Sequence, residues 1–164
     1  MLSMARSPIC YHYDYTIYTE TARDKLEKDT HMTYFLAKTD PEEYSIDQLE
    51  RDKSTVWDGV RNPQALRAIQ SMRPGDEVLI YHSAGQAAIV GLASVTSHPR
   101  PDPNDGKSWV VDLAFERRFT QPVTLREIKD SHLFDDWSLV RQGRLSTMSV
   151  PENAVTWLKE KKVL

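Results

Sequence analysis

The sequence predicts an α+β domain built on a curved or barrel-like β-sheet with short helices beside it. Two observations support this class. Runs of strand-forming residues follow one another along the chain as in a meander, and capped, amphipathic helical segments stand near the start and the end of that series. A doubly wound parallel sheet would instead place a helix after each strand, so the curved sheet fits better.

The first predicted elements are a strand and two helices. A short apolar run over residues 34–37 predicts the strand. Ser45-Ile-Asp-Gln48 has the spacing of a capping box and predicts a helix start. Asn62 before Pro63 is a typical N-cap followed by a first helical residue. The apolar face of this second helix is formed by Ala65, Leu66, Ile69 and Met72.

The remaining elements form the predicted sheet and close the chain. After a turn at residues 73–76, the β-rich runs 77–82 and 87–96 predict a hairpin, and a proline-rich loop then leads to a strand over 109–119. Thr124-Leu-Arg-Glu127 is a second capping box. An irregular stretch precedes a terminal helix over 151–161, with its inward face formed by Ala154, Val155 and Leu158.

Length and composition indicate one folded domain. The chain has 164 residues, of which 40% are hydrophobic and 27% charged, which excludes disordered, collagen-like and disulfide-scaffold classes. Residues 1–31, with alternating tyrosines, differ from the rest, and we expect them to be a poorly ordered N-terminal appendage. The alternative is that the tyrosines form an edge strand. The folded domain is expected over residues 32–164.

The charge balance limits the kind of nucleic-acid binding that is possible. The formal net charge is −3, and residues 32–164 carry 17 Lys and Arg against 19 Asp and Glu. This argues against a sequence-independent DNA coat and predicts weak binding to plain nucleic acid. A single cysteine, Cys10, and the lack of any apolar run of about 18 residues predict a cytoplasmic protein, nuclear in a eukaryote, without a membrane partner.

Signatures of enzymes and metal sites are missing. There is no glycine-rich phosphate loop, and His82, His98 and His132 are far apart and have no cysteine partners. Ser83 lacks the first glycine of a nucleophile elbow. Residues 101–106 look like a calcium loop but lack its closing glutamate, so a solvated turn is expected. We therefore expect no catalytic residue, no metal and no cofactor.

Four segments combine aromatic, polar and basic residues: 38–45, 56–62, 81–83 and 144–151. Because these four segments occur in this order, the sequence resembles the EVE domain, a member of the PUA-like group that includes the YTH and ASCH domains. The resemblance runs from about Met32 to the C-terminus. It rests on Lys38-Thr-Asp-Pro with Tyr44-Ser45, Trp57-Asp-Gly-Val-Arg-Asn62, Met72 with Gly75-Asp76, Tyr81-His-Ser83, Ile89-Val-Gly91, Pro101-Asp102-Pro103, Val123-Thr-Leu125 and Arg144-Leu-Ser146.

The resemblance implies a PUA-like curved mixed β-sheet or barrel, whose pocket receives one base flipped out of nucleic acid. YTH domains read a methylated adenine in RNA through an aromatic cage, and the EVE resemblance implies a modified cytosine in DNA. Trp57 matches the first cage tryptophan of the YTH pattern. No motif identifies a second wall, for which the loop 97–109 is the candidate.

The residues themselves are compatible with such a pocket, because a flipped base needs a stacking surface, polar groups for its edge and cations for the neighbouring phosphates. Trp57 is the candidate wall, and a carboxylate at Asp58 suits an exocyclic amine. The full base-binding set is Thr39, Trp57, Asp58, Gly59, Asn62, Tyr81, His82 and Ser83. The candidate phosphate-binding residues are Lys38, Arg61, Arg141 and Arg144.

Each candidate also has a structural interpretation. Trp57 can be core, Asn62 is an N-cap in any case, and Asp58 can cap a turn with Gly59. His82 and its neighbour Tyr81 can be alternating strand residues, Ser83 a hairpin residue, and Arg144 a partner of a carboxylate. The other tryptophans are expected to be packing residues, namely Trp109, Trp137 and Trp157.

Three functions remain open at the level of sequence. The leading hypothesis is a non-enzymatic reader of a modified base, with modified cytosine in DNA favoured. The alternative is a PUA-like RNA-binding domain that acts in RNA modification or translation. The weakest is an enzyme acting on a nucleotide or small molecule.

Overall fold

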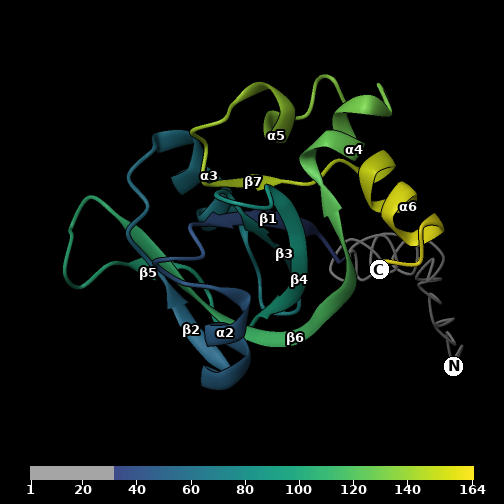
Figure 1. Ribbon diagram of the computed structural model, residues 1–164. Coiled ribbons are helices and arrows are strands. Elements are labelled where there is room, and N and C mark those ends of the chain that lie inside the picture. Colours follow the sequence, from purple (N-terminus) through teal and green to yellow (C-terminus); the bar gives the residue numbers. More distant parts are fainter. Residues whose placement is uncertain (1–31) are drawn as a thin grey trace, which may run out of the picture. The chain divides into compact units, whose positions relative to one another are not determined.

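The computed structural model describes residues 32–164, so the prediction for residues 1–31 lies outside the described residues. Strands and helices alternate irregularly along this part of the chain (Figure 1). In chain order they are β1 (Tyr34–Thr39), α2 (Ile46–Asp52), β2 (Ser54–Trp57), α3 (Pro63–Ser71), β3 (Glu77–His82), β4 (Ala88–Val95), β5 (Arg100–Pro101), β6 (Trp109–Thr124), α4 (Leu125–Asp130), α5 (Ser138–Arg141), β7 (Thr147–Ser149) and α6 (Glu152–Glu160).

The strands form one mixed sheet in the order β2-β6-β4-β3-β1-β7, with β5 paired to β6 beside this path. β1 and β3 are parallel, whereas the other neighbours are antiparallel. The long strand β6 bends as it passes from β2 to the start of β4, and the sheet curls with it (Figure 1). Register shifts in the β3–β4 and β4–β6 ladders accompany this bending. The predicted α+β class with a curved sheet is confirmed.

The predicted helix starts are confirmed in detail. Ser45 and Gln48 form a complete capping box on α2, and Thr124 and Glu127 form another on α4. The side chain of Asn62 accepts hydrogen bonds from the first backbone amides of α3. These caps are local interactions, which explains why the sequence pattern predicts them well.

Four short elements were not expected. β2 and β5 pair with β6, and β7 pairs with β1, while α5 is a single turn in the stretch expected to be irregular. Each is two to four residues long, too short to show a periodicity of its own. β6 also continues to Thr124, beyond the predicted end at residue 119, because β4 pairs with it there.

Helix α2 packs tightly against the concave sheet. A side chain at Gly91 would place its Cβ 2.7 Å from Ile46 Cδ1 and 2.9 Å from the carbonyl oxygen of Arg117. The three other tryptophans pack as expected: Trp137 is buried, and Trp157 and Trp109 are half-buried against the core. None of the helices within residues 32–164 has the length and apolar character needed to cross a membrane.

Candidate functional site

A cleft of about 440 Å³ opens where β1 and β2 end, a size within the usual range of ligand pockets. The ends of these strands and the segments that follow them supply most of its surface, and the residue before β7 completes it. The lining residues are Lys38, Thr39, Asp40, Glu43, Tyr44, Thr55, Val56, Trp57, Asp58, Gly59, Val60 and Ser146.

Trp57 belongs both to the core and to the cleft. As the last residue of β2 it is paired with Val111 of β6, and only 9% of its surface is exposed. Its Nε1 donates a hydrogen bond to the hydroxyl of Thr147, which is fully buried, at 3.3 Å. The indole is therefore held in one orientation, and its ring nitrogen is already used within the protein.

The segment after β2 presents an unpaired carboxylate to the cleft. Asp58 is exposed, and no hydrogen bond or ion pair joins its carboxylate to another described residue. Gly59 follows with a φ of +69°, a left-handed conformation that favours glycine and turns the chain. Val60 is then fixed because its carbonyl oxygen accepts a hydrogen bond from the buried hydroxyl of Ser108 at 2.7 Å.

Among residues 32–164, Lys38 is the one cation that lines the cleft. Its Nζ donates to the carbonyl oxygens of Gln142 and Gly143, at 3.4 Å each, and lies 5.6 Å from the ring centre of Tyr81. Burial lowers the pKa of the Lys38 ammonium. Lys38 thus ties the end of β1 to the chain after α5.

The other charged residues that line the cleft are acidic. Asp40 and Glu43 lie in the turn between β1 and α2, and with Asp58 they outnumber Lys38 by three charges to one. The turn is held because the hydroxyl of Thr39 donates to the carbonyl oxygen of Tyr44 at 2.8 Å. A cleft with this balance attracts hydrogen-bond donors and disfavours phosphate groups.

Comparison with known families identifies the family to which this domain belongs. The model of the EVE domain matches residues 33–160. The chain belongs to the EVE domain family. Rat thymocyte nuclear protein 1 is 32% identical over 127 residues, which are 60% of this chain and 56% of that protein. The chain therefore spans little more than half the length of this curated relative.

Solved structures share the EVE fold. A Rhodopseudomonas palustris protein determined by NMR has a TM-score of 0.73 and 32% identity, over 79% of this chain and 92% of that chain. The crystal structure of human THYN1 in complex with 5-methylcytosine containing DNA has a TM-score of 0.72 over 79% of this chain and 97% of that chain. Its identity is 23%, so this likeness shows the common fold alone.

The EVE domain brings five of the predicted residues together in the cleft. They are Lys38, Thr39, Trp57, Asp58 and Gly59. Tyr81 does not line it, because it is buried beneath the ammonium group of Lys38. No residue of the loop 97–109 lines the cleft either, so this loop supplies no second wall in the structure.

Three further candidates also lie off the cleft. Asn62 is used as the N-cap of α3. His82 is buried, and its Nε2 accepts a hydrogen bond from the backbone N–H of Ile46 at 3.1 Å; burial lowers the pKa of its imidazole. Ser83 extends the β1–β3 pairing, because both its backbone N–H and its hydroxyl donate to the carbonyl oxygen of Thr39. These residues support the strand ends beside the cleft.

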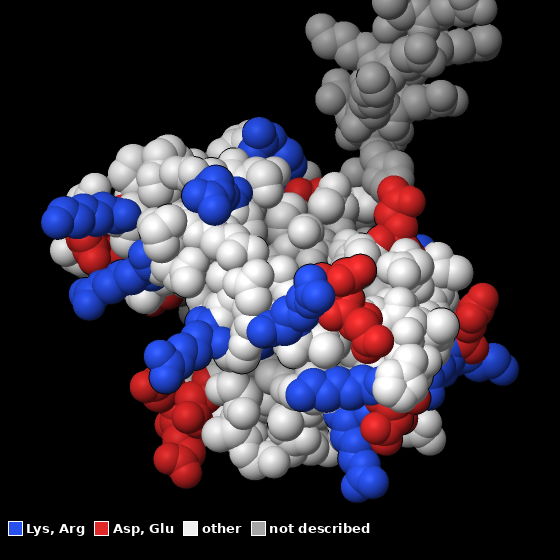
Figure 2. Space-filling model, turned by 90° about the horizontal axis from the view of Figure 1, so that it is seen from above, with Lys and Arg blue, Asp and Glu red and all other residues white. Residues whose placement is uncertain are grey.

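The predicted phosphate-binding arginines stand outside the cleft. Arg61, next to Val60, lies 3.4 Å from a carboxylate oxygen of Asp105, and Arg141 lies 3.2 Å from one of Asp136. Arg144 is exposed. On the face seen in Figure 2, Lys and Arg side chains are spread out and several lie beside Asp or Glu, so this face has no continuous basic surface.

Sequence reasoning missed seven lining residues of the EVE cleft. Asp40, Glu43 and Tyr44 belong to a segment that the sequence analysis had singled out, and Ser146 belongs to a quoted motif, so signals were present for these four. Val56 and Val60 belong to the segment 56–62, which had also been singled out, whereas Thr55 gave no signal, because the strand β2 was not expected.

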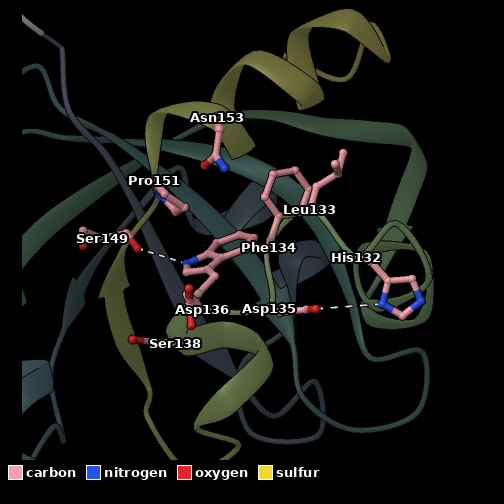
Figure 3. Close-up of a pocket in the computed structure, with 10 residues that line it drawn as sticks. His132, Leu133, Phe134, Asp135, Asp136, Ser138, Ser149, Pro151 and Asn153 are labelled. Carbon is pink, nitrogen blue, oxygen red and sulfur yellow. Dashed lines mark hydrogen bonds and ion pairs between the residues drawn. The ribbon is translucent and has the colours of Figure 1, made fainter.

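A second hollow, of about 450 Å³, lies where the segment before α5 meets the start of α6 (Figure 3). The Nε1 of buried Trp137 donates to the carbonyl oxygen of Ser149 at 3.1 Å, and Asn153 faces the hollow from α6. Asp135 and Asp136 add two exposed carboxylates. None of the residues predicted for base binding lines this hollow.

Proposed function

We propose that this EVE domain is a non-enzymatic reader of a modified cytosine in DNA, which it receives as a flipped base in the cleft at the ends of β1 and β2. The observation that carries the proposal is the combination of one fixed indole with an unpaired carboxylate in the same cleft. The human THYN1 complex with 5-methylcytosine containing DNA supports the choice of ligand.

The chemistry of the cleft suits the edge of an amine-bearing base. Cytosine presents its exocyclic amine as a donor, whereas thymine presents a carbonyl oxygen at the same position. The carboxylate of Asp58 accepts from such an amine and repels the carbonyl. Because Asp40 and Glu43 are also acidic, the phosphates of the flipped nucleotide are expected to stay outside, toward Arg61 and Arg144.

A modest preference for a methylated base follows from the apolar part of the lining. Val56, Trp57 and Val60 offer hydrocarbon surface, and 46% of the surface of Val56 is exposed. Burying one added methyl carbon is worth ~0.8 kcal/mol, which corresponds to about a fourfold gain in affinity. A methyl-dependent preference of this order is therefore expected.

The non-enzymatic part of the proposal rests on what the cleft contains. Within residues 32–164, no group of three or more His, Cys, Asp or Glu side chains is placed to hold a metal ion. His82, which is paired with Thr39 of the cleft in the β1–β3 ladder, is used in a hydrogen bond to the N-terminus of α2. The cleft is thus suited to recognition by hydrogen bonds and stacking.

The test is a titration of fluorescently labelled oligonucleotides with one sequence and three chemistries: DNA with 5-methylcytosine, the same DNA with plain cytosine, and the corresponding RNA. We expect the methylated DNA to bind about fourfold more tightly than the plain DNA. Equal affinity for both DNAs would contradict the proposal, and tighter binding of the RNA would favour the RNA-binding alternative.

Two matched variants locate the site. Asp58→Asn replaces a charged acceptor by a neutral one and should reduce the preference for cytosine over thymine at the flipped position about fivefold. Asp136→Asn makes the same change in the second hollow and should leave that preference unaltered. If Asp136→Asn has the larger effect, the base binds in the hollow beside Trp137 and the cleft assignment is wrong.

A further inference from the structure

A third cavity, of about 140 Å³, lies where the middle of β6 meets the chain after α6. Of the described residues that line it, half are cations and none carries a side-chain carboxylate. The lining residues are Arg117, Arg118, Phe119, Thr120, Gln121, Lys161, Lys162 and Val163. In a domain with more acidic than basic side chains, four cations around one small cavity form a local exception.

Two of these cations are already compensated. The guanidinium of Arg118 contacts the carboxylates of Asp47 and Glu50 on α2, the latter at 2.8 Å. The ammonium group of Lys161 lies 3.8 Å from Glu127. Arg118 and Lys161 are therefore held in place at the cavity by their partners.

The other two cations keep their charge available. Within residues 32–164, neither Arg117 nor Lys162 forms an ion pair, and both are exposed. The guanidinium of Arg117 lies 5.5 Å from the ring centre of Phe119, which restricts its position. The cavity thus combines two fixed cations with two that lack an anionic partner.

The backbone of β6 adds potential donors beside this cavity. β2 and β5 pair with the outer edge of β6 only as far as Ala114, and no described strand pairs with that edge over residues 115–124. An unpaired strand edge presents free N–H groups. Thr120 and Gln121, which line the cavity on this stretch, also carry side-chain donors.

We propose that this cavity binds a phosphate group. Its volume corresponds to about five water molecules, which suits one tetrahedral anion and is small for a base with its sugar. Guanidinium, ammonium, hydroxyl, amide and backbone N–H groups are the donors that bind phosphate in proteins. The structure therefore assigns an anion site to a region of the fold separate from the base cleft.

The phosphodiester backbone of bound nucleic acid is the source that the fold favours, and this part rests on the proposed function. Helix α2 links the two sites: Tyr44, just before it, lines the base cleft, and Asp47 and Glu50 on it hold Arg118. Its seven residues span about 10 Å. We expect a strand that places one base in the cleft to reach the cavity with one of its phosphates. Free inorganic phosphate presents the same anionic oxygens and is the other source of such a group.

Two measurements on the full chain test the site and distinguish the sources. The first is the rise in melting temperature with inorganic phosphate, at ionic strength matched with chloride. The second is the slope of log K against log salt for a DNA duplex with 5-methylcytosine. Both are compared for the wild type, the double variant Arg117→Gln/Lys162→Gln, Lys162→Gln alone, and the control Arg67→Gln. Arg67 is exposed on α3 and lines neither cavity.

We expect the double variant to lose the phosphate-dependent rise that the control retains, and its salt slope to fall by about 0.9 for each lost phosphate contact. A smaller slope identifies backbone phosphate as the source, whereas a lost thermal response with an unchanged slope identifies free phosphate. If the double variant matches Arg67→Gln in both measurements, the site does not exist. A missing preference for methylated DNA would refute the proposed function and leave the phosphate site standing.

Discussion

The hydrogen bond between Trp57 and Thr147 provides a sharp test of how the cleft wall is held. Both side chains are buried, and the bond joins the end of β2 to β7, two strands at opposite edges of the sheet order. Trp57→Phe keeps an aromatic ring but removes the donor, so the buried hydroxyl of Thr147 loses its partner. An unmade buried hydrogen bond of this kind costs about 1–3 kcal/mol.

The smaller ring adds a packing loss of about 1 kcal/mol, because the missing atoms no longer leave water on folding. The expected total is about 2–4 kcal/mol in the free energy of unfolding. With a urea m-value of ~2 kcal/mol/M, the midpoint of unfolding should fall by about 1–2 M. Urea denaturation followed by circular dichroism measures this shift.

Thr147→Val completes a double-mutant cycle. If the bond is formed, the loss in Trp57→Phe/Thr147→Val is smaller than the sum of the two single losses, with a coupling of about 1 kcal/mol. Strict additivity, or an unchanged midpoint in Trp57→Phe, would refute the reasoning and mean that packing alone orients the indole.

Three further outcomes are expected. Burial lowers the imidazole pKa of His82 from 6.5, so the folded state binds fewer protons than the unfolded state. The stability that neutral His82 contributes should be fully present above about pH 6.5 and be lost as the pH falls further. Acid unfolding of His82→Gln should therefore depend less on pH than that of the wild type. Gly59→Ala, at a φ of +69°, should destabilise by about 1–2 kcal/mol in thermal unfolding, whereas Gly143→Ala, not at positive φ, should cost less. Asn62→Ala should lower the free energy of unfolding by about 1 kcal/mol, because α3 loses its cap. The preference for cytosine over thymine in oligonucleotide titrations should remain, and its loss would mean that Asn62 contacts the base.

The parts of the fold that could be predicted depend on neighbours in sequence. The capping boxes at Ser45 and Thr124 join residues three positions apart, and the hairpin pairs β3 with β4, the next strand in the chain. β2 could not be predicted in this way, because its partner in β6 is more than fifty residues away. β2 is also the element that positions Trp57.

The difference between local and long-range contacts also explains which residues of the candidate site were predicted. Family resemblance brought Trp57 and Asp58 into the candidate set, and the structure places both on one cleft. His82 entered the same set because of its position at a strand end, but helix α2 packs above that strand and takes its side chain as a hydrogen-bond acceptor. A sequence pattern does not show which distant helix will cover a strand end.

The acidic character of the cleft was not predicted from the sequence. Asp40 and Glu43 come from the same segment as Lys38, which was assigned to phosphate binding because of its charge alone. In the structure Lys38 is half-buried and donates to two carbonyl oxygens, so its role beside the carboxylates is partly structural.

A crystal structure of the domain soaked with 5-methyldeoxycytidine tests the central claim most directly. The account predicts the base against the indole of Trp57, with its exocyclic amine within hydrogen-bond distance of the Asp58 carboxylate and its methyl group toward Val56 or Val60. Density for the nucleoside in the hollow beside Trp137, or in the cleft with the amine turned away from Asp58, would contradict it.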